Sequence, residues 1–141
     1  YSLQDNSVDM IVSQAVLEHI RKDEFLVIMQ ECQRIMSENG VSVHTIDLKD
    51  HLSKALNNLR FHHNFWESEF ISSSGFYTNR IRYSKMLEIF EHAGFSMSII
   101  SKNTWDELPT PRKRIAHPFN LLTDDELCVS EFTVLLNHAK L

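Results

Sequence analysis

The spacing of apolar and polar residues changes several times along the first third of the chain. Val8–Val12 is a nearly continuous apolar run, typical of a strand buried on both faces in a parallel sheet. Behind Asp23, a candidate N-cap, apolar residues recur every three or four positions as far as Met36, which predicts an amphipathic helix. Gly40 would end that helix, and Val41–Ile46 predicts the next strand. This order predicts a βαβ unit with parallel strands.

The middle of the chain is less regular. Asp50 is a candidate cap for a further helix, whose apolar face would include Leu56 and Leu59. Phe61–Arg82 is rich in aromatic, serine and asparagine residues without a helical or strand period, so we expect a partly ordered connection or lid. Ser84 is the expected cap of the next helix.

The last third predicts two strands separated by a long loop. Gly94 ends the preceding helix, and Phe95–Ser101 reads as a strand. All three prolines fall in the loop that follows, and Thr123–Glu126 has the spelling of a capping box. Phe132–Leu136 predicts the final strand. Because neither a repeat nor a linker divides the chain, residues 1–141 are expected to form a single unit.

Three segments, in this order and spacing, carry a resemblance to a known family: SVDMIVSQ, VLEHI and RIMSENG. They resemble the middle of the class I S-adenosylmethionine-dependent methyltransferases. The resemblance implies an α/β fold, namely a partial Rossmann-like sheet flanked by helices. Its strands would correspond to strands 4, 5, 7 and 6 of the family in that spatial order, with the last strand of the chain antiparallel. The family's strands 1–3 would have no counterpart in residues 1–141.

The cofactor-binding loop of this family has no counterpart either. The family holds its cofactor with a glycine-rich loop after strand 1 and an acidic residue after strand 2. Here Gly40, Gly75 and Gly94 are isolated, and no G-x-G occurs. The resemblance therefore implies S-adenosylmethionine as the cofactor of a complete parent protein, while we expect this chain alone to bind it poorly or not at all.

The remaining part of the site would lie where the first strand ends. By resemblance, Ser13, Gln14 and Ala15 would line the methionine and methyl end of the cofactor. His19 follows closely and is the candidate general base, because an unperturbed imidazole titrates near neutral pH. The alternative for His19 is a packing and hydrogen-bonding role at a helix entrance.

Further candidates for binding the substrate follow the second strand and the irregular segment. His44 and Asp47 could face a substrate at the end of Val41–Ile46, although His44 could equally lie on the covered face of its strand. Tyr77, Asn79 and Arg80 combine polar groups with an aromatic ring, so they could contact a substrate or form a surface loop.

Other residue types add little chemistry. His51 with His62 and His63 matches no ligand spacing of a metal site, so no metal is expected. Cys32 and Cys128 lie in apolar periodic segments, which favours buried free thiols and a reducing, cytoplasmic location.

Charge and hydropathy limit the partners. A net charge of −5 argues against nucleic acid, and no apolar run is long enough to cross a membrane. The basic run Arg112–Arg114 is either solvated surface or a site that steers an anionic substrate.

Three functions are compatible with these features. The favoured one is the carboxy-terminal part of a methyltransferase that acts on a small-molecule acceptor and is inactive alone. The alternative is a non-catalytic module that pairs with another chain, or forms a homodimer, through the exposed strand edge Val8–Ser13. A hydrolase is the weakest, because Ser13 lies between Val12 and Gln14 rather than between glycines.

Overall fold

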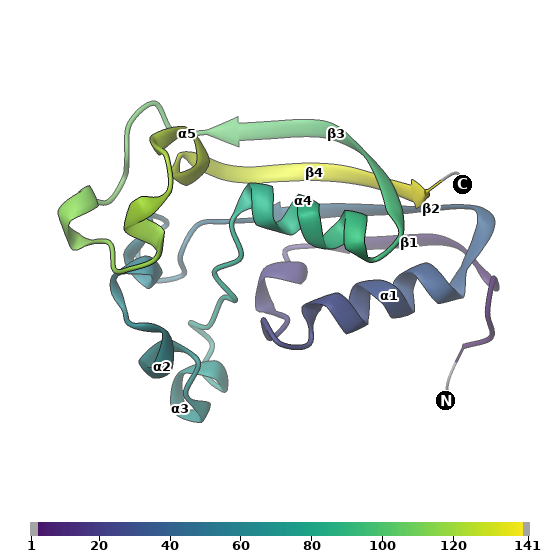
Figure 1. The fold of residues 1–141 in the computed structure, drawn as a ribbon, viewed down its shortest axis with the longest axis horizontal. Coiled ribbons are helices and arrows are strands. Elements are labelled where there is room, and N and C mark those ends of the chain that lie inside the picture. The colour runs from purple at the N-terminus through teal and green to yellow at the C-terminus, as the bar shows by residue number, and fades with distance from the viewer. Residues whose placement is uncertain (1–2, 140–141) are drawn as a thin grey trace.

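A computed structural model describes residues 3–139, which form one open four-stranded sheet with helices (Figure 1). In chain order the elements are β1 (Val8–Gln14), η1 (Leu17–His19), α1 (Phe25–Ile35), β2 (Met36–Asp47), η2 (Asn57–Arg60), α2 (His63–Trp66), α3 (Glu69–Ser72), α4 (Tyr83–His92), β3 (Phe95–Thr104), η3 (Arg112–Arg114), η4 (Phe119–Leu121), α5 (Asp124–Leu127) and β4 (Val129–His138), where η marks a 3₁₀ turn.

The sheet has the order β1-β2-β4-β3. β1 and β2 are parallel, and β4 runs antiparallel to both of its neighbours. Ser13 of β1 lies opposite His44 of β2, which lies opposite Val134 of β4, and β2 continues beyond the end of β1 to Asp47. This topology confirms the predicted order, including the antiparallel last strand.

The core lies on one face of the sheet, where α1 and α4 lie together (Figure 1). Phe25 and Met29 of α1 and Phe90 of α4 pack against buried strand residues such as Phe132 and Val134. Alternate residues of β2 and β4 are therefore buried, as expected for strands with one covered face.

The prediction that β1 is buried on both faces is wrong. Met10 and Val12 are 62% and 64% exposed, because α1 and α4 both cover the opposite face. β1 is also an edge strand that pairs with β2 alone among the described strands. Within residues 3–139, the apolar side chains Met10 and Val12 of β1 are therefore largely exposed.

The boundary between α1 and β2 also differs from the prediction. The helix ends at Ile35, and β2 begins at once with Met36 rather than at Val41. Gly40 lies inside the strand, where a Cβ atom would be only 3.0 Å from the carbonyl oxygen of Val8. The glycine is needed for close approach of two backbones and does not end the helix.

The helix predicted after Asp50 is not formed. One carboxyl oxygen of Asp50 accepts hydrogen bonds from the backbone N–H groups of Leu52 (2.9 Å) and Ser53 (2.6 Å), and the other accepts from that of Asn57. A local carboxylate thus stabilises a turn instead of a helix start. Nearby Leu56 and Leu59 pack in a second small cluster with Ile115 and Leu127, away from the main core.

Two helix signals near the carboxyl end are confirmed. Gly94 has a φ of +94° directly after α4, a conformation that favours glycine. Thr123 caps α5 by accepting a hydrogen bond from the N–H of Glu126. Ser84, in contrast, does not cap α4: its N–H and hydroxyl both donate to the Glu126 carboxylate.

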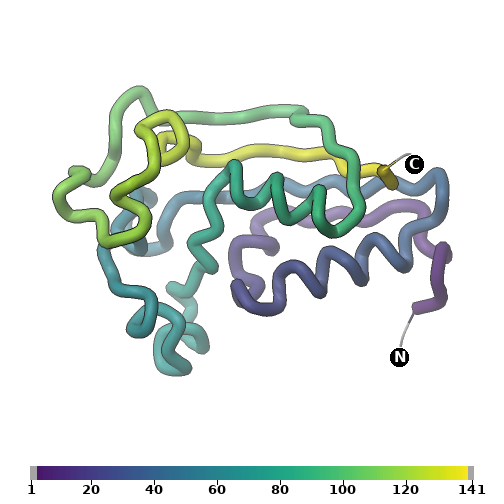
Figure 2. The backbone as a smooth tube through the Cα atoms, in the orientation of Figure 1, coloured from purple at the N-terminus to yellow at the C-terminus, as the bar shows by residue number. Residues whose placement is uncertain are grey.

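The carboxyl ends of β1, β2 and β3 lie at the same end of the molecule (Figure 2). The long connections 48–82 and 105–128 gather there, whereas the amino end of β3 and the carboxyl end of β4 lie at the other end. In residues 3–139, the longest helices are too short and too polar to cross a membrane.

Candidate functional site

The backbone turns sharply away from the sheet where β1 ends. Ala15 has a φ of +52°, and its N–H donates to the carbonyl of Thr45 on β2 at 2.9 Å. Gln14 and Ala15 are exposed, and η1 follows directly. We call Gln14–His19 the carboxyl-end turn. In open α/β sheets ligands bind at this edge, so the turn is the natural candidate site.

Ser13 is tied to β2 by His44. The hydroxyl of Ser13 lies 2.7 Å from Nδ1 of His44, and the hydroxyl of Ser42 lies 2.6 Å from Nε2. Burial lowers the pKa of His44 to about 4, so the ring is neutral near pH 7. One serine therefore donates to the ring and the other accepts from it. With 1% exposure on the covered face, His44 lies where the alternative interpretation put it.

His19 is exposed and has a defined base nitrogen. Its Nδ1 lies 2.9 Å from the carbonyl oxygen of Tyr77. A carbonyl only accepts, so Nδ1 carries the hydrogen, and in the neutral ring Nε2 keeps its lone pair. The ring also meets His51 edge-on, with 4.7 Å between centroids. The expected general base thus presents a basic atom at the turn.

Asn79 holds the carboxyl-end turn in place. Its side-chain amide donates to the carbonyls of Leu17 (2.8 Å) and Ile20 (2.9 Å), and its backbone N–H donates to that of Glu18 (2.7 Å). Its side-chain oxygen accepts from the N–H of Ile81. These contacts make Asn79 a buried clamp; direct contact with a substrate stays a prediction.

Tyr77 and Arg80 are also buried. The Tyr77 hydroxyl donates to Glu67 at 2.8 Å. The guanidinium of Arg80 lies between the rings of Trp66 and Phe119, at 5.4 and 5.1 Å from their centroids. The structure therefore brings the predicted substrate residues close to the turn, but binds their polar groups to other parts of the protein.

Asp47 lies at the end of β2 and is partly buried. It forms an ion pair with Lys49 at 3.0 Å and also accepts the N–H of Lys49. Asp47 therefore lies at the same edge as the turn, as predicted from the sequence, although its carboxylate already has a partner.

Glu18 is a residue that sequence reasoning missed. It is 2% exposed, and neither carboxyl oxygen makes a hydrogen bond. Burial raises the pKa of Glu18 to about 7, and nearby backbone N–H groups, including that of Asp47, partly oppose the rise. A single 3₁₀ turn follows neither the helix nor the strand period, so apolar spacing gives no signal of this burial.

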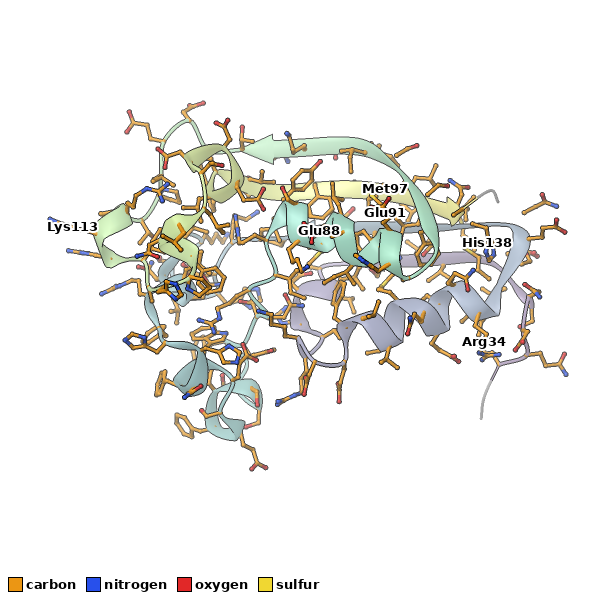
Figure 3. The ribbon with its side chains drawn as sticks, in the orientation of Figure 1. Arg34, Glu88, Glu91, Met97, Lys113 and His138 are labelled. Atoms are coloured by element: carbon orange, nitrogen blue, oxygen red, sulfur yellow. The ribbon has the colours of Figure 1, made fainter. Side chains whose placement is uncertain are left out.

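Two cavities bear on the choice of site. A small one of about 10 Å³ lies beside the turn and is lined by residues including Glu18, Asp47 and Asn58. A hollow of about 1280 Å³ lies at the opposite end of the sheet, where Figure 3 shows Met97 and His138. We place the candidate site at the carboxyl-end turn rather than in this hollow, because open α/β sheets bind ligands at the carboxyl ends of their strands. The small cavity beside the turn has room for about one water molecule.

Metal and thiol chemistry find no support in the described part of the chain. Among residues 3–139, no three His, Cys, Asp or Glu side chains gather as a metal site. Cys32 and Cys128 are free thiols, only partly buried rather than fully buried as expected.

Comparison with known proteins relates the chain to methyltransferases. The family model described as a methyltransferase domain matches residues 1–44. No curated protein matches. Three solved structures, each 14% identical to this chain, match along nearly its whole length. The YcgJ protein of Bacillus subtilis has a TM-score of 0.56, with 99% of this chain and 68% of that protein covered. The complex of the Haloferax volcanii Trm112 methyltransferase activator with a methyltransferase has a TM-score of 0.52, with 99% of this chain and 58% of the matched chain covered. An N-methyltransferase of Haemonchus contortus with phosphomonomethylethanolamine and S-adenosylhomocysteine has a TM-score of 0.53, with 100% of this chain and 36% of that protein covered.

At these identities the solved structures show the fold alone. The chain spans between 36% and 68% of the length of those three proteins. Because 99% or more of this chain is covered in each case, the match includes the four-stranded sheet and its helices.

Proposed function

We propose that this chain is the carboxy-terminal part of a class I S-adenosylmethionine-dependent methyltransferase that methylates a small-molecule acceptor. The methyltransferase-domain model that matches residues 1–44 supports this family. The chain would supply the base that takes up the proton and part of the site that binds the methyl acceptor. It would be inactive alone. The Haemonchus contortus protein, which was solved with a small phosphorylated amine, supports this class of acceptor.

The geometry of His19 carries the proposal. Its ring is exposed at the carboxyl-end turn, and its Nδ1–H is held by the carbonyl of Tyr77. The lone pair of Nε2 is therefore free to take a proton from an acceptor hydroxyl or amine as the methyl group is transferred. His19 would then carry the positive charge while its contact with Tyr77 is kept.

The residues of the turn fit one side of the cofactor. Gln14 and Ala15 are exposed with accessible backbone, and the positive φ of Ala15 turns the chain clear of the sheet. S-adenosylmethionine, when bound, supplies the methyl group. The glycines of this chain lie elsewhere, at β2, after α3 and after α4, so they do not form a glycine-rich loop at the turn.

Calorimetric titration with S-adenosylmethionine and S-adenosylhomocysteine tests the cofactor part of the proposal. We expect no heat of binding to this chain up to millimolar ligand, because the turn alone makes few contacts. Micromolar binding would overturn the expectation that this chain alone binds the cofactor poorly or not at all.

Methyl transfer is tested in the parent protein with His19→Asn. We expect the rate to fall by about 10²-fold or more, the usual contribution of a positioned base. His92→Asn is the matched control, because His92 is also exposed and its Nδ1 also contacts a backbone carbonyl, that of Glu88 at 2.7 Å. Equal rates for both variants and wild type would exclude His19 as the base.

We also propose that this chain by itself forms a homodimer through β1. Two observations support it: β1 is an edge strand, and its Met10 and Val12 side chains are largely exposed. An edge strand with apolar side chains favours pairing with another strand.

Sedimentation of the purified chain tests the homodimer. We expect a dimer that Val12→Lys dissociates. Ile100→Lys is the control, because Ile100 is 60% exposed on β3, the edge strand at the other side of the sheet. A wild-type chain that stays monomeric over the whole accessible concentration range would exclude pairing through β1.

A further inference from the structure

The buried polar side-chain atoms that lack a hydrogen-bond partner gather in one place. Within residues 3–139 there are five such atoms: both carboxyl oxygens of Glu18, Oδ1 of Asn58, and Nε of Arg80 and of Arg82. The four residues are each 5% exposed or less. All four line the small cavity beside the carboxyl-end turn. Since buried polar atoms usually have partners, this coincidence calls for an explanation.

The rest of each polar group is already held by other parts of the protein. The terminal nitrogens of Arg82 donate to three backbone carbonyls, those of Leu48, Leu127 and Val129. Arg80 donates to the carbonyl of Phe61 at 2.8 Å. Nδ2 of Asn58 donates to the hydroxyl of Thr78 at 2.9 Å. Because these contacts fix the side chains, the five atoms are not free to turn toward new partners.

Opposite charges line the cavity without direct contact. The carboxyl oxygens of Glu18 make no hydrogen bond to Arg80 or Arg82. The space between the residues has a volume of about 10 Å³. A cavity of about 10–15 Å³ is enough for one water molecule, and a buried water typically makes about three hydrogen bonds. A single water therefore matches the cavity in size.

The hydrogen-bonding groups also match water. The two arginines each offer an N–H donor, whereas Glu18 and Asn58 offer acceptor oxygens. A water molecule accepts two hydrogen bonds and donates two, so one molecule complements both kinds of group. The two guanidinium groups oppose a cation at this position, and the Glu18 carboxyl opposes an anion. A small neutral molecule that both donates and accepts fits best.

We propose that this cavity binds one water molecule, which accepts hydrogen bonds from Arg80 and Arg82 and donates hydrogen bonds to Glu18 and Asn58. The site joins η1, η2 and the segment before α4. It goes beyond the proposed methyl transfer, because this water is a structural ligand and takes no part in the reaction. Water that bridges buried groups in this way is part of the protein structure.

The bound water supplements the Asn79 clamp. Asn79 lines the same cavity and holds the carboxyl-end turn by direct hydrogen bonds. The water holds the turn through Glu18 and extends the contact to Asn58, a residue about 40 positions further along the chain. The turn that carries His19 is thus held both by the segment before α4 and by η2.

NMR contacts between water and the purified chain test the site. The Nε–H signals of Arg80 and Arg82 should each show a contact to water that has opposite signs in laboratory-frame and rotating-frame Overhauser experiments, the signature of a long-lived bound water. The Nε–H of Arg34 is the control. It donates to Glu31 at 2.7 Å near the surface and should show no such contact. Absence of the water contact at Arg80 or at Arg82 would overturn the inference.

Asn58→Met tests whether one water serves both arginines. The longer apolar side chain would occupy the cavity and expel the water, so both contacts should disappear together. Asn57→Met is the matched control, because Asn57 also lies in η2 but its amide donates to the Ser53 hydroxyl in an exposed position. This control should keep both contacts.

A contact that persists at either arginine in Asn58→Met would overturn the single shared water. If this variant does not fold, the wild-type measurement still decides whether the water is bound. Neither readout involves cofactor, acceptor or methyl transfer, so this inference and the proposed function can fail separately.

Discussion

His44 and Glu18 are buried ionisable residues at the carboxyl ends of neighbouring strands, and the protein treats them in opposite ways. Both nitrogens of His44 have a serine hydroxyl within 2.7 Å, whereas neither oxygen of Glu18 has a hydrogen-bond partner. Desolvation dominates both, and it favours the neutral form in each case. His44, whose nitrogens both have partners, connects β1 to β2. Glu18 has no such partner, and its pKa of about 7 lets it change charge near neutral pH.

The two residues link stability to pH with opposite sign. The pKa of His44 falls from 6.5 to about 4 on folding, so its contribution is complete above pH 6.5 and is lost as the pH falls toward 4. The pKa of Glu18 rises from 4.5 to about 7, so its contribution is complete below pH 4.5 and is lost as the pH rises toward 7. Where these two pH windows overlap, between about pH 4.5 and 6.5, the two slopes nearly cancel.

Removal of the partnered residue should have the largest effect. We expect His44→Ala to lower the free energy of unfolding by roughly 3–4 kcal/mol, because it leaves a cavity and two serine hydroxyls without their partner. Urea denaturation at pH 7 measures this loss. Thr45→Ala, on the opposite face of β2 and bonded only to the Thr133 hydroxyl, should cost about 1 kcal/mol. Similar losses for the two variants would contradict the comparison.

Glu18→Gln should act in the opposite direction and only above neutral pH. An ionised Glu18 destabilises the fold, so a neutral amide of the same shape should stabilise it by up to ~3 kcal/mol at pH 8 and by little at pH 4.5. Denaturation across this pH range measures the gain. The variant should also unmask the His44 slope, with stability that rises from pH 4 to 6.5. A gain of equal size at both ends would show that the charge of Glu18 is irrelevant.

Loss of the Asn79 clamp should change the free energy of unfolding somewhat less than the change at Glu18. We expect Asn79→Ala to cost ~2 kcal/mol, because the carbonyls of Leu17 and Ile20 lose a buried donor. Hydrogen exchange should show faster opening of the carboxyl-end turn than of β2. Asn103→Ala, whose amide is exposed and contacts Glu131, is the control and should change little. Equal effects of the two changes would mean that the clamp is unimportant.

The smallest effect on stability should come from the candidate base. His19 is exposed, so His19→Asn should change the free energy of unfolding by no more than ~0.5 kcal/mol. Thermal denaturation measures this change. A loss well above that size would favour the alternative in which His19 chiefly packs and hydrogen-bonds at the turn.

Local signals in the sequence were sufficient wherever one element decides its own structure. Apolar spacing predicted α1 and α4, and runs of β-branched residues predicted the cores of β2 and β4. Gly94 and Thr123 act through their own backbone and their nearest turn, so both predictions are confirmed. Asp50 misled the prediction because the same carboxylate can start a helix or close a turn.

The candidate site was only partly predictable. The position of His19 after the first strand follows from the order of the elements, and so does that of Asp47 after the second. The burial of Glu18 and the clamp by Asn79 do not follow, because they depend on residues about 60 positions apart that meet only in the fold.

Periods of two and 3.6 residues and local caps were sufficient to predict the four strands, the two long helices, their order and the parallel βαβ start. They were not sufficient for the segment after Asp50, where the predicted helix does not form. Tertiary structure alone decided that both long helices cover the same face, which leaves Val12 exposed although its apolar run indicated burial. It also decided that His44 is partnered and Glu18 is not. Hydrogen bonds and desolvation depend on what surrounds a group in space, and no local pattern of residues specifies those surroundings.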